Sequence, residues 1–133
     1  MARRIFLSFA EEDKPYREFL VAPARQQRLP IEFVDMTPKR AADEAWKSQT
    51  RRAVEGCDAM IALLSWRTLT APGARWEMQC ARAARLPMMG VYIHGERRPT
   101  VPRELSGRRV VEWNWEEVAA FVRSSAQPSA PGT

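Results

Sequence analysis

The sequence has 133 residues, of which 45% are hydrophobic and 28% are charged. This length and composition suit one globular domain with its own core, and no apolar run approaches the roughly 20 residues that span a bilayer. The net charge of +5 is carried largely by scattered arginines, without the basic stripe interleaved with aromatic residues that nucleic-acid-binding proteins show. We therefore expect neither a nucleic acid nor a membrane as partner.

The few cysteines and the single histidine limit the metal and redox chemistry. Cys57 precedes an apolar run and Cys80 lies on an apolar helical stripe, so both are expected to be buried free thiols. Two Cys and one His are too few for the common four-ligand zinc site, and no metal site is expected. The N-terminal segment lacks the apolar core and cleavage site of a signal peptide, so we expect a cytoplasmic protein.

Strand-like and helical segments alternate along the chain. Apolar runs of strand length predict strands at 4–9, 29–35, 58–64, 87–94 and 109–113. Helical patterns predict a helix after Asp13, limited or kinked by Pro23, and further helices at 43–55, 74–85 and 115–123. Asp13 and Asn114 are expected to cap their helices, and Gly56 is expected to end the second one in the left-handed conformation. Tyr16, Phe19 and Leu20 are expected to share one face of the first helix.

This alternation predicts a doubly wound α/β fold, a parallel sheet of about five strands with helices on both faces. Residues 58–64 are apolar at nearly every position, as in a parallel strand buried on both faces, and 109–113 is expected at a sheet edge. We expect a single domain over residues 1–123. The Ser-, Pro- and Ala-rich residues 124–133 are expected to form a flexible tail.

Glu77 is the unusual residue of the predicted helix 74–85. It lies on a stripe of small and apolar residues, where a carboxylate is costly to desolvate unless it lies at an opening. In parallel α/β sheets the first turns of helices lie at the carboxyl edge of the strands, where ligands bind. Two interpretations stay open from spacing: an acid that faces a cleft, or a solvated glutamate at the positive end of the helix dipole. Spacing alone favours the second.

Several site chemistries are excluded by missing motifs. Neither glycine-rich phosphate-binding loop occurs, and Leu64-Ser65 stands where a receiver domain has its acceptor aspartate. Ser65 lacks the G-x-S-x-G elbow, and His94 has no nearby partner for nucleophilic catalysis. A lone carboxylate still suits cleavage of a glycosidic bond, because it stabilises the positive charge that develops on the sugar. A cationic leaving group such as the nicotinamide of NAD+ needs no strong general acid.

Four segments resemble TIR and TIR-like domains. Residues 4–13 (Arg-Ile-Phe-Leu-Ser-Phe-Ala-Glu-Glu-Asp) resemble the opening strand and loop, and 57–65, 74–81 and 87–92 resemble the middle section. The resemblance covers roughly residues 3–94. It is strongest to the TIR-like proteins of bacterial Thoeris anti-phage defence, in which Trp-Glu on a helix precedes an Ala-rich turn. Many TIR domains instead place Trp-Cys several residues before their glutamate, whereas Trp76 is adjacent to Glu77.

The resemblance implies a flavodoxin-like fold and an NAD+ nucleosidase or ADP-ribosyl cyclase that uses NAD+ as substrate and needs no cofactor. The catalytic glutamate of the family maps onto Glu77. Residues of the loops after the first two strands would border the nucleotide: Ser8, Phe9, Ala10, Glu11, Asp35, Met36 and Lys39. Trp46 and Trp76 would supply stacking or wall the pocket, although both suit a core position equally well.

The function implied is the release of nicotinamide and the production of a cyclic or conjugated ADP-ribose second messenger in anti-phage defence. A phage-derived protein would act as trigger, and a separate effector would be reached through the diffusible nucleotide; homo-oligomerisation is left open. The alternatives are a non-catalytic TIR-like scaffold and a phage-sensing binding module. Hydrolysed, cyclic and conjugated products all stay open, because they differ only in which nucleophile reaches the anomeric carbon.

Overall fold

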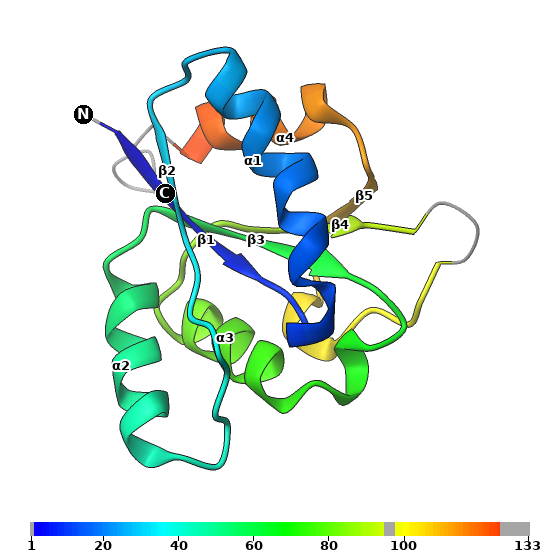
Figure 1. Ribbon diagram of the computed structural model, residues 1–133. Helices are drawn as coiled ribbons and strands as arrows, with labels where there is room; N and C mark the ends of the chain where they lie inside the picture. The colour runs from blue at the N-terminus through cyan, green and yellow to red at the C-terminus, as the bar shows by residue number, and fades with distance from the viewer. Residues whose placement is uncertain (1, 95–97, 126–133) are drawn as a thin grey trace.

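The computed structural model describes residues 2–94 and 98–125, and a single parallel sheet forms its centre (Figure 1). The strands are β1 (Arg3–Ser8), β2 (Ile31–Val34), β3 (Ala59–Leu64), β4 (Met88–Tyr92) and β5 (Arg109–Glu112). They form a 5-stranded sheet in the order β2-β1-β3-β4-β5, and every neighbouring pair is parallel. The predicted flavodoxin-like α/β fold is confirmed.

Helices cover both faces of this sheet. The α-helices are α1 (Glu18–Gln26), α2 (Glu44–Glu55), α3 (Pro72–Ala83) and α4 (Trp115–Ser125). Short 3-10 helices are η1 (Glu11–Arg17), η2 (Thr68–Thr70) and η3 (Arg103–Leu105). In Figure 1, α1 and α4 lie above the sheet, and α2 and α3 lie below it.

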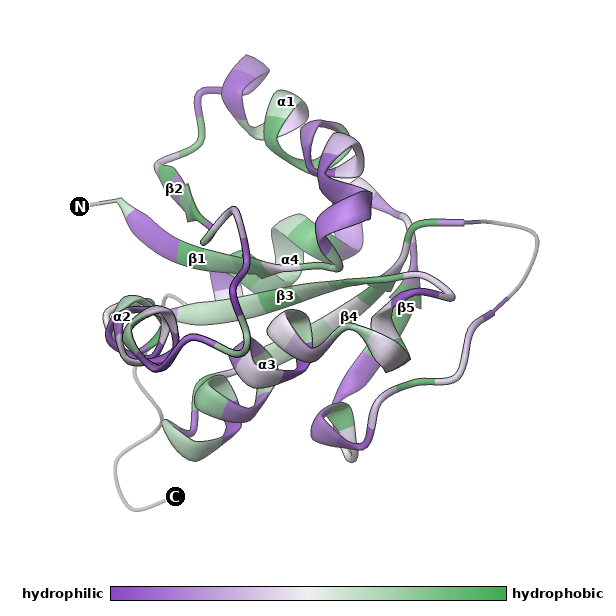
Figure 2. Cartoon of the chain, turned by 60° about the horizontal axis from the view of Figure 1, so that its bottom comes forward, coloured by the Kyte–Doolittle hydropathy of each residue, from purple (hydrophilic) through white to green (hydrophobic). Residues whose placement is uncertain are grey.

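Successive side chains of β1 point to opposite faces of the sheet, so the core has two layers. Ile5 and Leu7 pack in the layer that contains the buried residues of α1 and α4, whereas Phe6 packs with those of α2 and α3. β3 is buried at every residue and lies at the centre of the sheet, as its continuous apolar run predicts; it is hydrophobic along its length in Figure 2. β5 lies at one edge of the sheet, also as predicted.

Side-chain caps fix the starts of two helices. The Asp43 carboxylate accepts hydrogen bonds from the backbone N–H groups of Ala45 and Trp46 at the start of α2. The Asn114 side chain accepts two such bonds at the start of α4, as predicted. Gly56 follows α2, but its φ of −83° is not left-handed. Its position therefore needs no glycine-specific conformation, and that part of the prediction is wrong.

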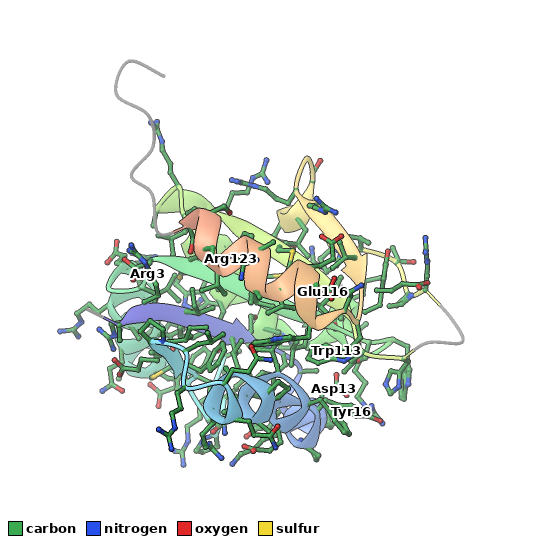
Figure 3. The ribbon with its side chains drawn as sticks, turned by 90° about the horizontal axis from the view of Figure 1, so that it is seen from above. Arg3, Asp13, Tyr16, Trp113, Glu116 and Arg123 are labelled. Carbon is green, nitrogen blue, oxygen red and sulfur yellow. The ribbon has the colours of Figure 1, made fainter. Side chains whose placement is uncertain are left out.

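The segment after β1 also differs from the prediction. Asp13 does not cap a helix; it lies within η1, is fully buried, and accepts hydrogen bonds from Ser65 Oγ and Arg67 Nη1 (Asp13 is labelled in Figure 3). α1 continues past Pro23 to Gln26. Phe19 is 62% exposed, so it does not share the buried face of Leu20. Because η1 winds at three residues per turn, the face expected from a continuous α-helix shifts before Phe19.

The remaining expectations concern the thiols and the chain ends. Cys57 and Cys80 are buried free thiols, as predicted. None of the helices in the described ranges has the length and apolarity needed to cross a membrane. α4 includes Ser124 and Ser125, the first two residues of the expected tail. The rest of that tail, 126–133, and residues 95–97 of the loop after β4 lie outside the described residues.

Candidate active site

Glu77 lies on the buried face of α3. The helix begins with Pro72, whose missing N–H has no intrahelical partner at this position. Ala74, Glu77 and Ala81 follow at helical spacing and all have 0% exposure. Helical spacing correctly predicts that Glu77 lies on the inward face of α3. The two interpretations drawn from that spacing, an acid that faces a cleft and a solvated glutamate, both differ from the structure. The carboxylate is neither solvated nor open to a cleft.

Two side chains hold the Glu77 carboxylate. Ser8 Oγ, at the carboxyl end of β1, lies 2.9 Å from Glu77 Oε1. Lys39 Nζ, from the loop after β2, lies 2.6 Å from Glu77 Oε2, and the Lys39 side chain is only 5% exposed. Three segments that are far apart in the sequence therefore meet at the carboxyl edge of the sheet, the edge at which α/β folds bind ligands.

Gly73 makes room for the Lys39 side chain. A Cβ atom at residue 73 would lie 3.0 Å from both Cβ and Cδ of Lys39. The ammonium of Lys39 also lies 4.7 Å from the centroid of the Phe9 ring, and the Lys39 backbone N–H donates to Glu11 Oε2 at 3.0 Å. The contact with Glu11 fixes the Lys39 backbone, and the absence of a side chain at Gly73 leaves room for the Lys39 side chain to reach Glu77.

Burial dominates the protonation of Glu77. Desolvation raises its pKa to about 7, although Lys39 and Ser8 both favour the charged form. The Ser8 hydroxyl lies within hydrogen-bond distance of both Glu77 Oε1 and the Ala74 carbonyl oxygen, at 2.9 and 3.1 Å. When Ser8 donates to Ala74, a protonated Glu77 can donate to Ser8. Both charge states of Glu77 therefore have hydrogen-bond partners at this site.

A cavity opens beside Lys39, and a second cavity adjoins it. The inner cavity, of about 300 Å³, is lined mainly by polar residues and the start of α3: Glu11, Glu12, Lys39, Trp66, Arg67, Gly73 and Ala74. The outer cavity, of about 510 Å³, is lined by basic, aromatic and amide side chains that include Lys47, Arg75, Trp76, Gln79 and Arg103. Both cavities also contact Ala41, Thr70 and Pro72, so together they form one groove, here called the α3 groove. Lys39 lies between this groove and Glu77.

The other predicted site residues fall in several places. Glu11 and Lys39 line the inner cavity, and Trp76 lines the outer one. Phe9 and Ala10 are fully buried. A separate cavity of about 400 Å³ is lined by the three remaining residues, Asp35, Met36 and Trp46. Two of them nevertheless lie close to the Lys39–Glu77 pair: the Met36 carbonyl oxygen is 3.4 Å from Lys39 Nζ, and the charge of Asp35 contributes to the raised pKa of Glu77.

Trp76 connects α2 and α3. Its indole N–H donates to the Lys47 carbonyl at 3.1 Å. The cationic groups of Lys47 and Arg51 lie 4.4 and 5.1 Å from the centroid of its ring. These contacts tie the two helices together, so the ring of Trp76 is already engaged within the protein.

Sequence analysis missed Trp66 and Arg67, which border the inner cavity. Trp66 is 69% exposed, and the Arg67 guanidinium lies 4.3 Å from the centroid of its ring. Arg67 Nη1 is in turn held 2.9 Å from Asp13 Oδ1. A tryptophan two residues after the end of a buried parallel strand was the available signal, because that position lies at the ligand-binding edge. Across residues 2–94 and 98–125, no cluster of His, Cys, Asp and Glu side chains could hold a metal ion.

Comparisons with known proteins agree with this fold. No curated protein sequence matches the chain. The TIR domain of the Toll-related receptor TRR-2 from Hydra magnipapillata has a similar structure, with a TM-score of 0.66 and 16% identity over 90% of this chain and 97% of that one. A prokaryotic SEFIR domain has a TM-score of 0.56 and 11% identity, with 98% and 100% of the two chains covered.

A third similar structure is the CMP N-glycosidase BcmB of Clostridium botulinum, with a TM-score of 0.53 and 15% identity over 92% of this chain and 97% of that one. At these identities the similar structures show the fold alone. The sequence itself matches the family model of the TIR domain over residues 5–124. The chain belongs to the TIR domain family.

Proposed function

We propose that the protein is a TIR-like enzyme of the Thoeris type, which cleaves NAD+ in the cytoplasm and releases nicotinamide. Its product is a cyclic or conjugated ADP-ribose that carries a signal to a separate effector during phage infection, after activation by a phage-derived protein. The observation that carries this proposal is the Glu77 carboxylate, which is buried at the carboxyl edge of the sheet, directly behind the α3 groove.

The chemistry requires one well-placed carboxylate. When the bond between C1′ of the ribose and the nicotinamide nitrogen breaks, the electron pair leaves with the neutral nicotinamide and positive charge develops on the ribose. A carboxylate in a site that excludes water stabilises that charge strongly. A water or hydroxyl nucleophile then attacks C1′ and loses its proton. With its pKa raised by burial to about 7, Glu77 is suited to accept that proton at neutral pH.

The size and charge of the α3 groove suit a dinucleotide. Its cavities, of about 300 and 510 Å³, fall within the range of small-molecule sites. Glu11 and Glu12 line the end nearest Glu77, where they would attract the cationic nicotinamide ring. Lys47, Arg75 and Arg103 line the other cavity and would attract phosphate groups. A CMP N-glycosidase has a similar fold, which is compatible with this proposal. The similarity concerns the fold and is not evidence of activity in this chain.

The direct test is nicotinamide release from NAD+ by the purified protein and by its Glu77→Gln variant. Loss of the negative charge is expected to reduce the rate by about 100-fold or more, as for other groups that stabilise a charged transition state. Glu116→Gln is the matched control, because Glu116 is exposed on α4, on the opposite face of the sheet. Equal rates for the wild type and the Glu77→Gln variant would refute the assignment.

A second candidate is a non-catalytic scaffold or phage-sensing module. Lys39 closes off the Glu77 carboxylate, whose exposure is 0%, and the apolar side chains of Phe19 and Trp66 are 62% and 69% exposed, so a partner protein could bind them. This candidate predicts self-association or binding of a phage protein that the Glu77→Gln variant retains, with no consumption of NAD+ during infection.

A further inference from the structure

We propose that Lys39 is a specificity-determining residue. When substrate binds, the Lys39 ammonium leaves the Glu77 carboxylate and pairs with a phosphate on the same ribose that Glu77 acts upon. The site would thereby select nicotinamide nucleotides, which carry a 5′-phosphate on that ribose, over the nucleoside nicotinamide riboside. Because this role concerns the ligand of Glu77, it rests on the proposed NAD+ cleavage.

Lys39 has to move before any substrate can reach Glu77. Oxygen Oε2 of the carboxylate is 2.6 Å from Lys39 Nζ, and Oε1 is 2.9 Å from Ser8 Oγ. Lys39 lines the inner cavity together with Gly73 and Ala74, whereas Glu77 has no exposed surface. The lysine ammonium therefore occupies the place from which the C1′ atom of a ribose would contact the carboxylate.

Once it leaves Glu77, the Lys39 ammonium needs another anion. A buried cation without a partner is strongly unfavourable, and Lys39 is only 5% exposed in its present position. The acids that line the same cavity are Glu11 and Glu12, and the Met36 carbonyl oxygen, 3.4 Å from Lys39 Nζ, carries no net charge. Glu11 already accepts a hydrogen bond from the backbone N–H of Lys39 through Oε2. A phosphate on the substrate is a partner that arrives together with the ribose.

The covalent structure of the nucleotide favours this exchange. The 5′-phosphate and C1′ belong to the same ribose, so a ribose held at Glu77 carries its phosphate nearby. The Lys39 backbone is fixed by Glu11, while its side chain is a flexible four-carbon stem ending in a compact charge. The ammonium can therefore swing from the carboxylate to the phosphate without a change in the loop. NMN and NAD+ supply that phosphate, and nicotinamide riboside does not.

The first test compares substrate preference. We expect Lys39→Met to lower the ratio of kcat/KM for NMN to kcat/KM for nicotinamide riboside by at least tenfold. Any effect of freeing Glu77 that is the same for both substrates cancels in this ratio. Lys14→Met is the matched control, because Lys14 is exposed on η1 and the same charge is removed; it should leave the ratio unchanged. An unchanged ratio in Lys39→Met would overturn the proposal.

The second test observes the lysine directly and separates this role from the proposed function. The chain has only three lysines, Lys14, Lys39 and Lys47, so the side-chain ¹³Cε signals of the isotope-labelled wild-type protein can be assigned from single Lys→Met variants. We expect the Lys39 signal to shift on addition of NMN but not of nicotinamide riboside. The Lys14 signal should stay in place with both.

The outcomes distinguish the two claims. If nicotinamide is released from NMN while the Lys39 signal stays unmoved, the exchange is wrong and the enzymatic proposal stands. If Lys39 responds to NMN alone and no nicotinamide appears, the exchange stands and the enzymatic proposal fails. If both compounds move the Lys39 signal equally, Lys39 turns to Glu11 or Glu12 instead, and the phosphate role is wrong.

Discussion

The Lys39–Glu77 pair sets the behaviour of the site at the scale of single residues. Both side chains are buried and lie 2.6 Å apart, and a buried ion pair gains little net stability because desolvation offsets the attraction. What the pair provides instead is two charged groups directly behind a groove that can admit a ligand. The absence of a side chain at Gly73 is what allows this arrangement.

In Gly73→Ala the new Cβ would lie 3.0 Å from two Lys39 atoms, so we expect the Lys39 side chain to shift by a few tenths of an ångström and its contact with Glu77 to weaken. Overpacking of this kind costs about 1–3 kcal/mol of unfolding free energy, and weakening the ion pair should raise the pKa of Glu77 further. Chemical denaturation and ¹³C NMR titration of the glutamate carboxyl groups measure both effects. In Gly56→Ala, the control, the nearest atoms to the new Cβ lie 3.5 Å away, and no pKa change is expected. A stable Gly73→Ala variant with an unchanged Glu77 pKa would contradict this packing.

The pKa of Glu77 also makes stability depend on pH. Burial raises it from 4.5 to about 7, so between these values the folded state binds more protons than the unfolded state. Stability from this group is present below pH 4.5 and is lost as the pH rises through about 7, by a total of about 3 kcal/mol. The unfolding free energy of the wild type minus that of Glu77→Gln should therefore fall across this range. A difference that rises with pH would mean that Lys39 keeps Glu77 ionised.

At the scale of elements, the loop between β3 and α3 is held by a buried acid. Asp13 accepts from Ser65 Oγ and Arg67 Nη1, and Arg67 lies against the ring of Trp66. Asp13 in η1 thereby fixes the loop that carries Trp66 at the mouth of the inner cavity.

Asp13→Asn should loosen this loop while leaving the sheet intact. Hydrogen bonds to charged groups contribute about 1.5–3 kcal/mol, so amide hydrogen exchange in residues 65–70 should be about 10- to 100-fold faster if local opening governs it. Exchange in β3 serves as the internal control. Equal acceleration in both segments would indicate global destabilisation, and no acceleration in 65–70 would show that Asp13 does not hold the loop.

The strands were predictable from the sequence because their signal is local. Residues 59–64 are apolar at every position and buried at every position, so the central strand needed no tertiary information. The role of Asp13 was not predictable, since an aspartate two residues before a proline also suits a helix cap, and only packing against Ser65 and Arg67 decides between the two.

The candidate site was predictable only in part for the same reason. Helical spacing placed Glu77 on the buried face of α3, and the TIR resemblance singled out Lys39 as a residue near the nucleotide. Their direct contact joins positions 38 residues apart through an irregular loop, whose path no periodic pattern determines. The space that Gly73 leaves for Lys39 is likewise a property of the packed structure alone.

At the scale of the whole molecule, the parallel sheet brings the loops after β1, β2 and β3 to one edge (Figure 1). That edge holds the carboxylate, its lysine and the α3 groove, with both acids and bases lining the inner cavity and only bases among the charged residues of the outer one. TIR domains include both NADases and signalling scaffolds, so the fold permits either function. Whether substitution of Glu77 changes NAD+ cleavage distinguishes the two.

The most direct test is mass spectrometry of nucleotides from phage-infected cells that carry the wild type or the Glu77→Gln variant. The enzymatic account predicts falling NAD+, rising nicotinamide and a new ADP-ribose derivative in wild-type cells only. NAD+ levels that stay the same in both, with both proteins folded and present, would contradict it.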